Sequence, residues 1–185
     1  IPYLMNFHEP FVLISTGTWS ISLNPFNDNA LTKEELDADC LFYMSYSGTP
    51  VKASRLFAGY EHEVQTKRIA AHYGVTTAKF KSLDVEWDII AKVEKELSPE
   101  LAAAWSSFDS VDLSRFADHI DAYHAFMLHL VHAQVRSTQL VLSPDQRTRR
   151  VFVDGGFSKN QLFMNLLARA FPNCEVYAAS MAQAT

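Results

Sequence analysis

Residues 151–171 read VFVDGGFSKNQLFMNLLARAF and carry the clearest structural signal in the chain. The apolar run Val151–Val153 predicts a buried strand, and the glycine pair that follows predicts a turn. From Lys159 to about Ala170 the apolar residues recur at helical spacing, which predicts an amphipathic helix. A strand that passes through a glycine turn into a helix is typical of a sheet covered by helices.

The turn between this strand and helix has the features of an anion-binding site. Ser158 and Gln161 fit a capping box, and Phe157 and Leu162 occupy the positions of a hydrophobic staple. A helix that begins here would point free N–H groups and the positive end of its dipole at the turn. Gly155–Gly156 would let a phosphate or a flat ring approach the main chain. A plain strand-to-helix turn that needs glycine for its φ angles is the alternative.

A second glycine turn lies in residues 11–23, FVLISTGTWSISL. An apolar run, a turn and an alternating segment predict two strands joined by a hairpin, with Trp19 in the core. The turn holds Thr16, Gly17 and Thr18, whose amides can form an anion-binding nest and whose hydroxyls can donate. Taken alone, an ordinary hairpin turn is the simpler explanation.

The two turns together favour phosphate binding over two structural turns. If both strands belong to one sheet, both turns can face the same crevice. The sequence contains neither Gly-x-x-x-x-Gly-Lys-Ser/Thr nor Gly-x-Gly-x-x-Gly, which excludes a Walker-type loop and removes the main support for a Rossmann dinucleotide site. Phosphate binding would therefore have to come from these turns.

The rest of the chain predicts a mixed α/β domain without internal repeats. Strands are expected at Leu41–Tyr46 and Glu175–Ala178, and the weakly periodic stretch Ala102–Phe116 is expected to be a short helix or a loop. Helices are expected at Ala53–Tyr73, along the apolar stripe of Trp87, Ile90, Val93 and Leu97 before Pro99, and at Asp118–Leu142.

Composition excludes several classes of protein. A length of 185 residues fits one domain, and a net charge of -5 gives no positive excess for gripping nucleic acid phosphates. No apolar run approaches the length of a membrane span, so a cytoplasmic protein without a membrane partner is expected. Cys40 and Cys174 are too far apart to suggest a disulfide framework. His129 and His132 share a helix face, but nothing supplies further ligands, so no metal site is predicted.

Taken together and in this order, residues 11–23 and 151–171 resemble the C-terminal domain of the FGGY carbohydrate kinases, with rhamnulokinase and fuculokinase nearest in motif. The resemblance implies an actin-like ATPase fold, related to ribonuclease H, with a mixed sheet and helices on its faces. The first motif is similar to that fold's second phosphate loop, and the second motif is similar to its adenosine loop. The likeness spans most of residues 1–185, although 76–116 match only in being helical.

The resemblance also implies an ATP site with Mg²⁺. Its residues would be Thr16, Gly17, Thr18, Gly155, Gly156, Phe157 and Asn160. The residues of the first turn would lie against the β- and γ-phosphates. Gly155 and Gly156 of the second turn would contact the α-phosphate and the ribose. Phe157 and Asn160 would border the adenine.

The resemblance further implies that this chain is the nucleotide-binding part of a longer enzyme. Members of the family use an aspartate shortly before the hairpin as the base for the attacking sugar hydroxyl, whereas Glu9 is the acid available before Phe11 here. We therefore expect the base upstream of Ile1, and the sugar substrate bound by an N-terminal domain that residues 1–185 lack. The chain alone would not phosphorylate a sugar, and a homodimer is left open.

Three functions remain in competition. The resemblance favours ATP-dependent phosphorylation of a sugar of the ketose type, with Gly59-Tyr60-Glu61 departing from the element that family members often carry there. A non-catalytic actin-like module is the second hypothesis, such as a sugar-sensing regulator or a chaperone-type ATPase. The third is an unrelated α/β enzyme whose glycine turns are only structural.

Overall fold

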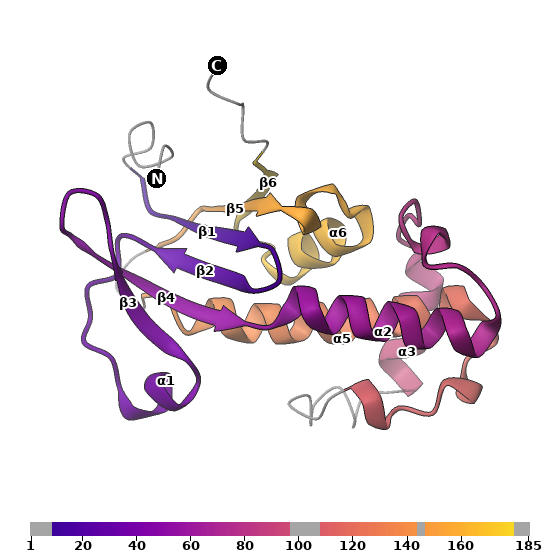
Figure 1. The fold of residues 1–185 in the computed structure, drawn as a ribbon. Coiled ribbons are helices and arrows are strands. Elements are labelled where there is room, and N and C mark those ends of the chain that lie inside the picture. Colours follow the sequence, from indigo (N-terminus) through magenta and orange to yellow (C-terminus); the bar gives the residue numbers. More distant parts are fainter. Residues whose placement is uncertain (1–8, 97–107, 144–146, 180–185) are drawn as a thin grey trace, which may run out of the picture.

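The computed structural model describes residues 9–96, 108–143 and 147–179, which form a mixed sheet with helices packed against it (Figure 1). The strands are β1 (Phe11–Thr16), β2 (Ser20–Asn24), β3 (Cys40–Met44), β4 (Pro50–Leu56), β5 (Arg150–Gly155) and β6 (Glu175–Ala178). They make a six-stranded sheet in the order β3-β4-β2-β1-β5-β6. β1, β5 and β6 run parallel, and the pairs on the other side are antiparallel.

The α-helices are α1 (Lys33–Asp37), α2 (Ala58–Tyr73), α3 (Trp87–Glu96), α5 (His119–Gln139) and α6 (Gln161–Ala170), with the 3-10 helices η2 (Thr77–Phe80), η3 (Phe108–Ser110), η4 (Leu113–Arg115) and η5 (Gly156–Lys159). Four of these five described α-helices, α2, α3, α5 and α6, contribute to the core on one face of the sheet, whereas α1 has no buried residue. Val12, Ile14 and Val153 point into this core. Phe11, Leu13 and their neighbours form a smaller cluster on the opposite face. No helix in the described ranges combines the length and hydropathy of a membrane span.

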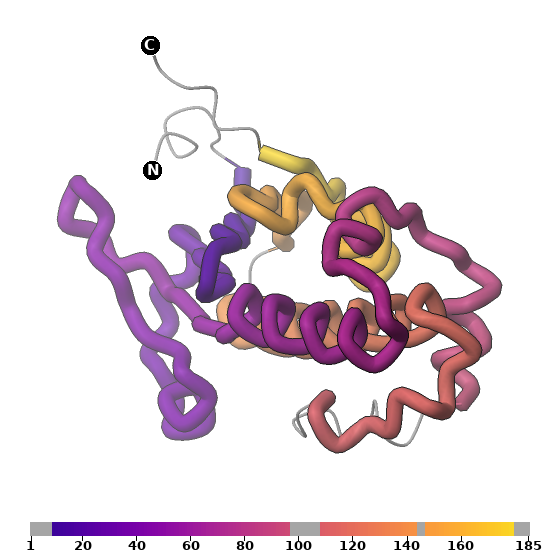
Figure 2. Tube along the Cα trace, turned by 45° about the vertical axis from the view of Figure 1, so that its right-hand side comes forward, coloured from indigo at the N-terminus to yellow at the C-terminus, as the bar shows by residue number. Residues whose placement is uncertain are grey.

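The helix α5 is the centre of the helical layer. Of its 21 residues, 14 are buried, because α2, α3 and α6 pack around it while the sheet covers another side. Figures 1 and 2 both show α2 lying alongside α5. Asp118 caps its N-terminus by accepting hydrogen bonds from the amides of Ile120 and Asp121. The long helix predicted at Asp118–Leu142 is thus confirmed, with ends that differ by one to three residues.

Buried hydroxyl pairs set the position of α5 under the sheet. Ser22 of β2 lies 2.9 Å from the hydroxyl of Thr138, and Ser54 of β4 lies 2.8 Å from that of Ser137. Each hydroxyl is buried and satisfied by its partner, so sliding the helix would leave buried polar groups unpaired. These pairs fix which residues of α5 face the site.

The helix predicted from Ala53 is wrong in its first part, because Pro50–Leu56 forms the strand β4. Residues 51–54 of β4 are all buried, so side chains on both faces of the strand are covered. A strand covered on both faces loses the alternation that identifies strands in a sequence. Lys52 makes the strand still harder to recognise from the sequence, because this charged residue is buried and paired with Glu35 at 2.7 Å.

The placement of Trp19 in the core is also wrong. Its side chain is 43% exposed and stacks on Phe57, with ring centroids 4.4 Å apart. Alternation with Ile21 predicted burial, but Trp19 precedes β2 and lies in the turn, where the alternation of the strand does not apply. Leu97, Pro99 and the first part of Ala102–Phe116 lie outside the described residues, and the remainder of that stretch contains η3 and η4.

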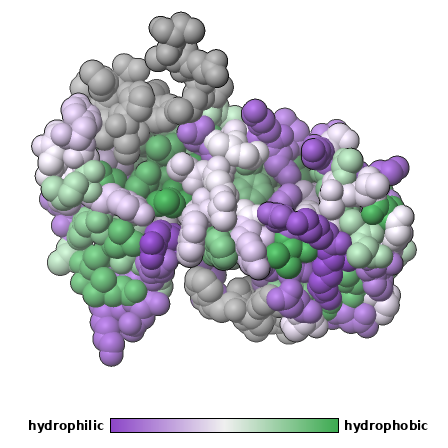
Figure 3. Space-filling model, in the orientation of Figure 1, coloured by the Kyte–Doolittle hydropathy of each residue, from purple (hydrophilic) through white to green (hydrophobic). Residues whose placement is uncertain are grey.

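The hairpin formed by β3 and β4 projects from the body of the domain (Figure 2). Figure 3 shows hydrophobic residues gathered over this region, and Leu36 and Met44 are among the exposed apolar side chains there. In the sheet, β2 lies between this hairpin and the β1–β5 pair that carries the predicted glycine turns.

The start of α2 is packed directly against the first glycine turn. The amides of Gly59 and Tyr60 donate to the carbonyl of Thr18 at 3.1 and 3.2 Å. A Cβ atom at Gly59 would overlap the carbonyl of Gly17, so the helix can approach this closely because residue 59 has no side chain.

Replacing Gly59 by alanine is expected to lower the free energy of unfolding by about 2 kcal/mol, because the added methyl group must displace the Gly17 carbonyl. Helix propensity alone predicts the opposite sign, since alanine stabilises a helix by about 1 kcal/mol relative to glycine. Urea unfolding followed by circular dichroism measures the difference.

Gly156→Ala is the matched control, because a Cβ atom there meets no heavy atom within 4 Å. Its free energy of unfolding should stay within about 0.5 kcal/mol of the wild-type value. A Gly59→Ala protein that is more stable than wild type would contradict the close contact.

Candidate functional site

The two glycine turns are neighbours in the sheet. β1 and β5 pair in parallel, with Thr16 opposite Gly155, so both strands end at the same edge. The carboxyl ends of adjacent parallel strands are where α/β domains commonly bind ligands. The condition set by the sequence, that both strands belong to one sheet, is therefore met.

A single hydroxyl joins the two turns. The Oγ1 atom of Thr16 donates to the carbonyl of Asp154 and accepts from the amide of Phe157 at 3.0 Å. Gly155 has a φ of 85°, and a Cβ atom on it would overlap the carbonyl of Thr16. The second turn thus needs glycine at 155 both for its left-handed conformation and for its close approach to β1.

The start of α6 differs from the capping box predicted at Ser158. The helix begins at Gln161, and its N-cap is Asn160, whose Oδ1 accepts from the amide of Phe163 at 2.9 Å. The short helix η5 comes first, and the hydroxyl of Ser158 donates to the carbonyl of Gly155 at 2.7 Å. Asparagine is a strong N-cap residue, and here Asn160 rather than Ser158 caps the helix. The side-chain amide of Asn160 is consequently held at the N-terminus of α6.

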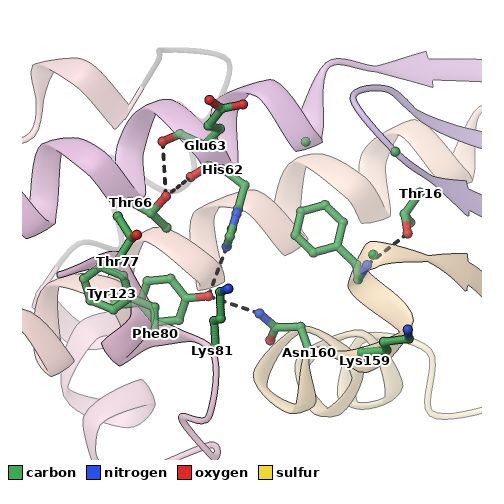
Figure 4. A pocket seen from close by; sticks show the side chains of 14 residues that line it. Thr16, His62, Glu63, Thr66, Thr77, Phe80, Lys81, Tyr123, Lys159 and Asn160 are labelled. Carbon is green, nitrogen blue, oxygen red and sulfur yellow. Dashed lines mark hydrogen bonds between the residues drawn. The ribbon is translucent and has the colours of Figure 1, made fainter.

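Both turns open into one pocket of about 580 Å³ (Figure 4). Five of the seven predicted site residues line it, namely Thr16, Gly17, Gly156, Phe157 and Asn160. Thr18 and Gly155 are not among the lining residues. The carbonyl of Thr18 accepts from the start of α2, while Gly155 lies against Thr16.

The rest of the pocket lining comes from residues that the sequence analysis did not assign to the site. Gly59, His62, Glu63 and Thr66 come from α2, Thr77, Phe80 and Lys81 from η2 and the residue after it, Tyr123 from α5, and Lys159 from η5. A glycine in the first turn of a helix was the one available signal, because it marks a close approach of two backbones. The other residues come from separate elements and share no motif or fixed spacing in the sequence.

Aromatic rings form the apolar part of the walls. Phe80 stacks on Tyr123 with centroids 4.6 Å apart and planes within 13°. Phe157 stacks on Phe163 at 4.6 Å, and the ring of His62 meets Phe157 edge-on at 5.2 Å. Flat surfaces of this kind suit a planar ligand ring.

Two ionisable groups that line the pocket, His62 and Tyr123, are held neutral. Burial lowers the pKa of His62 to about 4 and raises the pKa of Tyr123 to about 12. The hydroxyl of Tyr123 lies 3.1 Å from both His62 Nε2 and Asn160 Nδ2. At neutral pH the three groups therefore form an uncharged hydrogen-bonded chain.

The charge available to a ligand in the pocket is positive. Lys81 and Lys159 line it, whereas the carboxylate of Glu63 pairs with Lys67 at 2.5 Å. Within the described ranges there is no group of three or more His, Cys, Asp or Glu side chains arranged to hold a metal ion. The pocket thus combines backbone turns, aromatic faces and two ammonium groups, which together suit an anion that carries a planar ring.

Replacing Thr16 by valine is expected to lower the free energy of unfolding by about 2 kcal/mol, because the buried amide of Phe157 loses its acceptor. Thr16→Ser keeps the hydroxyl and should retain most of the stability, so the comparison separates the hydrogen bond from the lost methyl group. Thermal and urea unfolding of both variants provide the measurement. Equal stabilities of the valine and serine variants would show that the bridge is unimportant.

Residues 8–185 match the family described as "Carbohydrate kinase FGGY, C-terminal domain". A carbohydrate kinase from Novosphingobium aromaticivorans superimposes with a TM-score of 0.60 at 22% identity, over 93% of this chain and 37% of that one. The activator of the 2-hydroxyisocaproyl-CoA dehydratase from Clostridium difficile, solved with bound ADPNP, gives a TM-score of 0.46 at 13% identity, over 95% and 55%. No curated protein matches the chain.

The likeness to the Novosphingobium kinase is one of fold, and the chain spans 37% of that kinase's length. The mixed sheet with its packed helices agrees with that fold and confirms the predicted mixed α/β class. The family match extends over nearly every residue, including both glycine turns. The chain belongs to the FGGY carbohydrate kinases, as a C-terminal domain of that family.

Proposed function

We propose that this chain binds ATP in the pocket between β1, β5 and α2, and that it supplies the nucleotide-binding part of a longer carbohydrate kinase. The observation that carries the proposal is the convergence of two glycine turns, from neighbouring parallel strands, on one pocket. A volume of about 580 Å³ is in the range of pockets for ligands of this size. Membership in a carbohydrate kinase family supports the reaction class.

The phosphates would lie at the turns. Thr16, Gly17 and Thr18 would face the β- and γ-phosphates along the main chain, because Gly17 has no side chain and the hydroxyl of Thr16 already donates to the carbonyl of Asp154. The α-phosphate and ribose would lie over Gly155 and Gly156. Gly156 supports this placement, since the space where its Cβ would be is open.

The adenine would lie at the aromatic end of the pocket. Phe157 and Asn160 would border it, with Phe80 and Tyr123 forming the facing wall. Lys159 follows the second turn and would offset phosphate charge. Such a pose extends from the tip of the β1–β2 hairpin to η2, which are the two ends of the lining (Figure 4).

Mg²⁺ would enter with the nucleotide. This ion usually keeps several waters and is held by phosphate oxygens with one or two carboxylates rather than by a protein cage. The pocket fits that mode in offering room for a polyphosphate that would carry the ion. When bound, the ion would neutralise charge on the phosphates.

The chain's share of the reaction would be positioning. Phosphoryl transfer depends on placing the γ-phosphoryl in line with the attacking hydroxyl and on stabilising its charge. The turns and lysines described here can hold the donor, whereas the base aspartate and the sugar pocket are expected outside residues 1–185. The likeness of the two motifs to rhamnulokinase and fuculokinase motivates a ketose as the acceptor.

Gly156→Val is expected to weaken ATP binding at least about tenfold, because the side chain would fill the space assigned to the ribose and α-phosphate. Isothermal titration of both proteins with ATP and ADP measures the loss. Ala170→Val adds bulk at an exposed position of α6 away from the pocket and serves as the matched control. Equal heats for wild type and Gly156→Val would count against the site.

The enzyme that contains this chain is expected to release ADP when supplied with ATP, Mg²⁺ and a ketose or deoxyketose. A coupled assay over ketoses, aldoses and polyols measures the rate for each acceptor. We expect kcat/KM for a ketose to exceed that for the other sugars by at least about tenfold, which corresponds to about 1.4 kcal/mol of transition-state discrimination. Turnover confined to aldoses would refute the assignment of the acceptor, and ATP binding without turnover on any sugar would favour a non-catalytic module.

A further inference from the structure

Three side chains from three helices meet at the aromatic end of the pocket. Tyr123 of α5 is 1% exposed, and its hydroxyl lies 3.1 Å from Nδ2 of Asn160 and 3.1 Å from Nε2 of His62 (Figure 4). All three residues line the pocket. The ring of Tyr123 is fixed by its stacking on Phe80.

The direction of each hydrogen bond follows from the groups involved. Oδ1 of Asn160 accepts from the amide of Phe163, which orients the side-chain amide so that Nδ2 faces Tyr123. An amide nitrogen only donates, so the hydroxyl oxygen of Tyr123 accepts from Asn160 and its proton must go elsewhere. The acceptor within reach among the described residues is Nε2 of His62.

This arrangement fixes the protonation of His62. Because Nε2 accepts, the proton of the neutral imidazole is on Nδ1. Burial supports the neutral form, since it lowers the pKa of His62 to about 4. The opposite direction would leave the buried proton of Tyr123 without an acceptor in the described part of the chain, which is unfavourable.

The groups at the two ends of this hydrogen-bonded series, on His62 and on Asn160, are both N–H donors. Nδ1–H of His62 and the second N–H of Asn160 have no partner among the described residues. Lys81 lines the same end of the pocket and adds an ammonium group, which also only donates (Figure 4). The carboxylate of Glu63 is engaged by Lys67.

We propose that His62 and Asn160, positioned by the hydroxyl of Tyr123, form a donor wall that selects ligands by a hydrogen-bond acceptor in the base. This inference rests on the proposed nucleotide site and adds a rule of specificity to it. For a purine nucleotide the acceptor is a lone pair of a ring nitrogen, N1, N3 or N7. A ligand that offers only C–H groups there would leave the donors of the wall buried and unpaired.

Deaza analogues of ATP test the rule, because each replaces one ring nitrogen by C–H and removes one acceptor. We expect at least one of 1-deaza-ATP, 3-deaza-ATP and 7-deaza-ATP to bind wild type about tenfold more weakly than ATP. In Tyr123→Phe the Kd of that analogue divided by the Kd of ATP should fall below about threefold. The reason is that His62 and Asn160 lose the hydroxyl that positions both of them. Isothermal titration measures all of the ratios.

Tyr73→Phe is the matched control. The hydroxyl of Tyr73 donates to the carbonyls of Leu113 at 2.6 Å and Phe116 at 3.1 Å, away from the pocket lining. Its loss removes a tyrosine hydroxyl from the same helical layer, so the variant should lose stability yet keep the wild-type deaza ratio. A fall in the ratio for this variant as well would mean that general loosening, and not the wall, sets specificity.

Asn160→Asp provides a second variant should Tyr123→Phe not fold. Aspartate is also a good N-cap, so α6 should remain capped, while the donor facing the base becomes an acceptor. We expect ATP to bind this variant more weakly and the deaza penalty to fall. An Asn160→Asp protein with the wild-type deaza ratio would exclude Asn160 from the wall.

The outcomes separate this inference from the proposed function. If wild type does not bind ATP, the proposed function fails and the donor wall fails with it. If wild type binds ATP and all three analogues within about twofold, only the donor wall is overturned. If the wild-type penalty persists unchanged in Tyr123→Phe, the positioning role of Tyr123 is wrong.

Discussion

The parallel pairing of β1 with β5 is the constraint on which the rest of the site depends. Its register puts Thr16 opposite Gly155, and the Thr16 hydroxyl then bonds to both sides of the second turn. Neither turn is specific by itself, because glycine turns are common at strand ends. Held together, they place two stretches of main chain on one pocket, which is what a polyphosphate requires.

The helical layer supplies the walls of the pocket that the sheet edge does not. Gly59 lets α2 approach the first turn closely, and the hydroxyl pairs between the sheet and α5 fix the level at which Tyr123 enters the pocket. Tyr123 then links α2 to the N-cap of α6 through His62 and Asn160. The wall is therefore a consequence of how three helices pack, and a shift of any one of them would change its hydrogen bonds.

The sequence predicted those helices and strands whose pattern of apolar residues agrees with their burial in the structure. The long helix α5 was found because its apolar pattern, its length and its capping residue Asp118 coincide. The last strand β6 has the predicted bounds, although three of its four residues are exposed. The strand β4 was missed because burial on both faces removes alternation, and Trp19 was misplaced because a turn interrupts it. The N-cap of α6 was put at Ser158 because a sequence does not show that a 3-10 turn precedes the helix.

The sequence by itself determined the two glycine turns, their place at the ends of strands and the family to which such a pair belongs, because these signals lie within a few consecutive residues. Only the tertiary structure decided which residues face the turns. His62, Lys81 and Tyr123 come from three separate segments, and their side chains meet through packing that leaves no mark at any fixed spacing. The donor character of the wall has the same origin, since the two hydrogen bonds of Tyr123 in it join residues at least 37 positions apart.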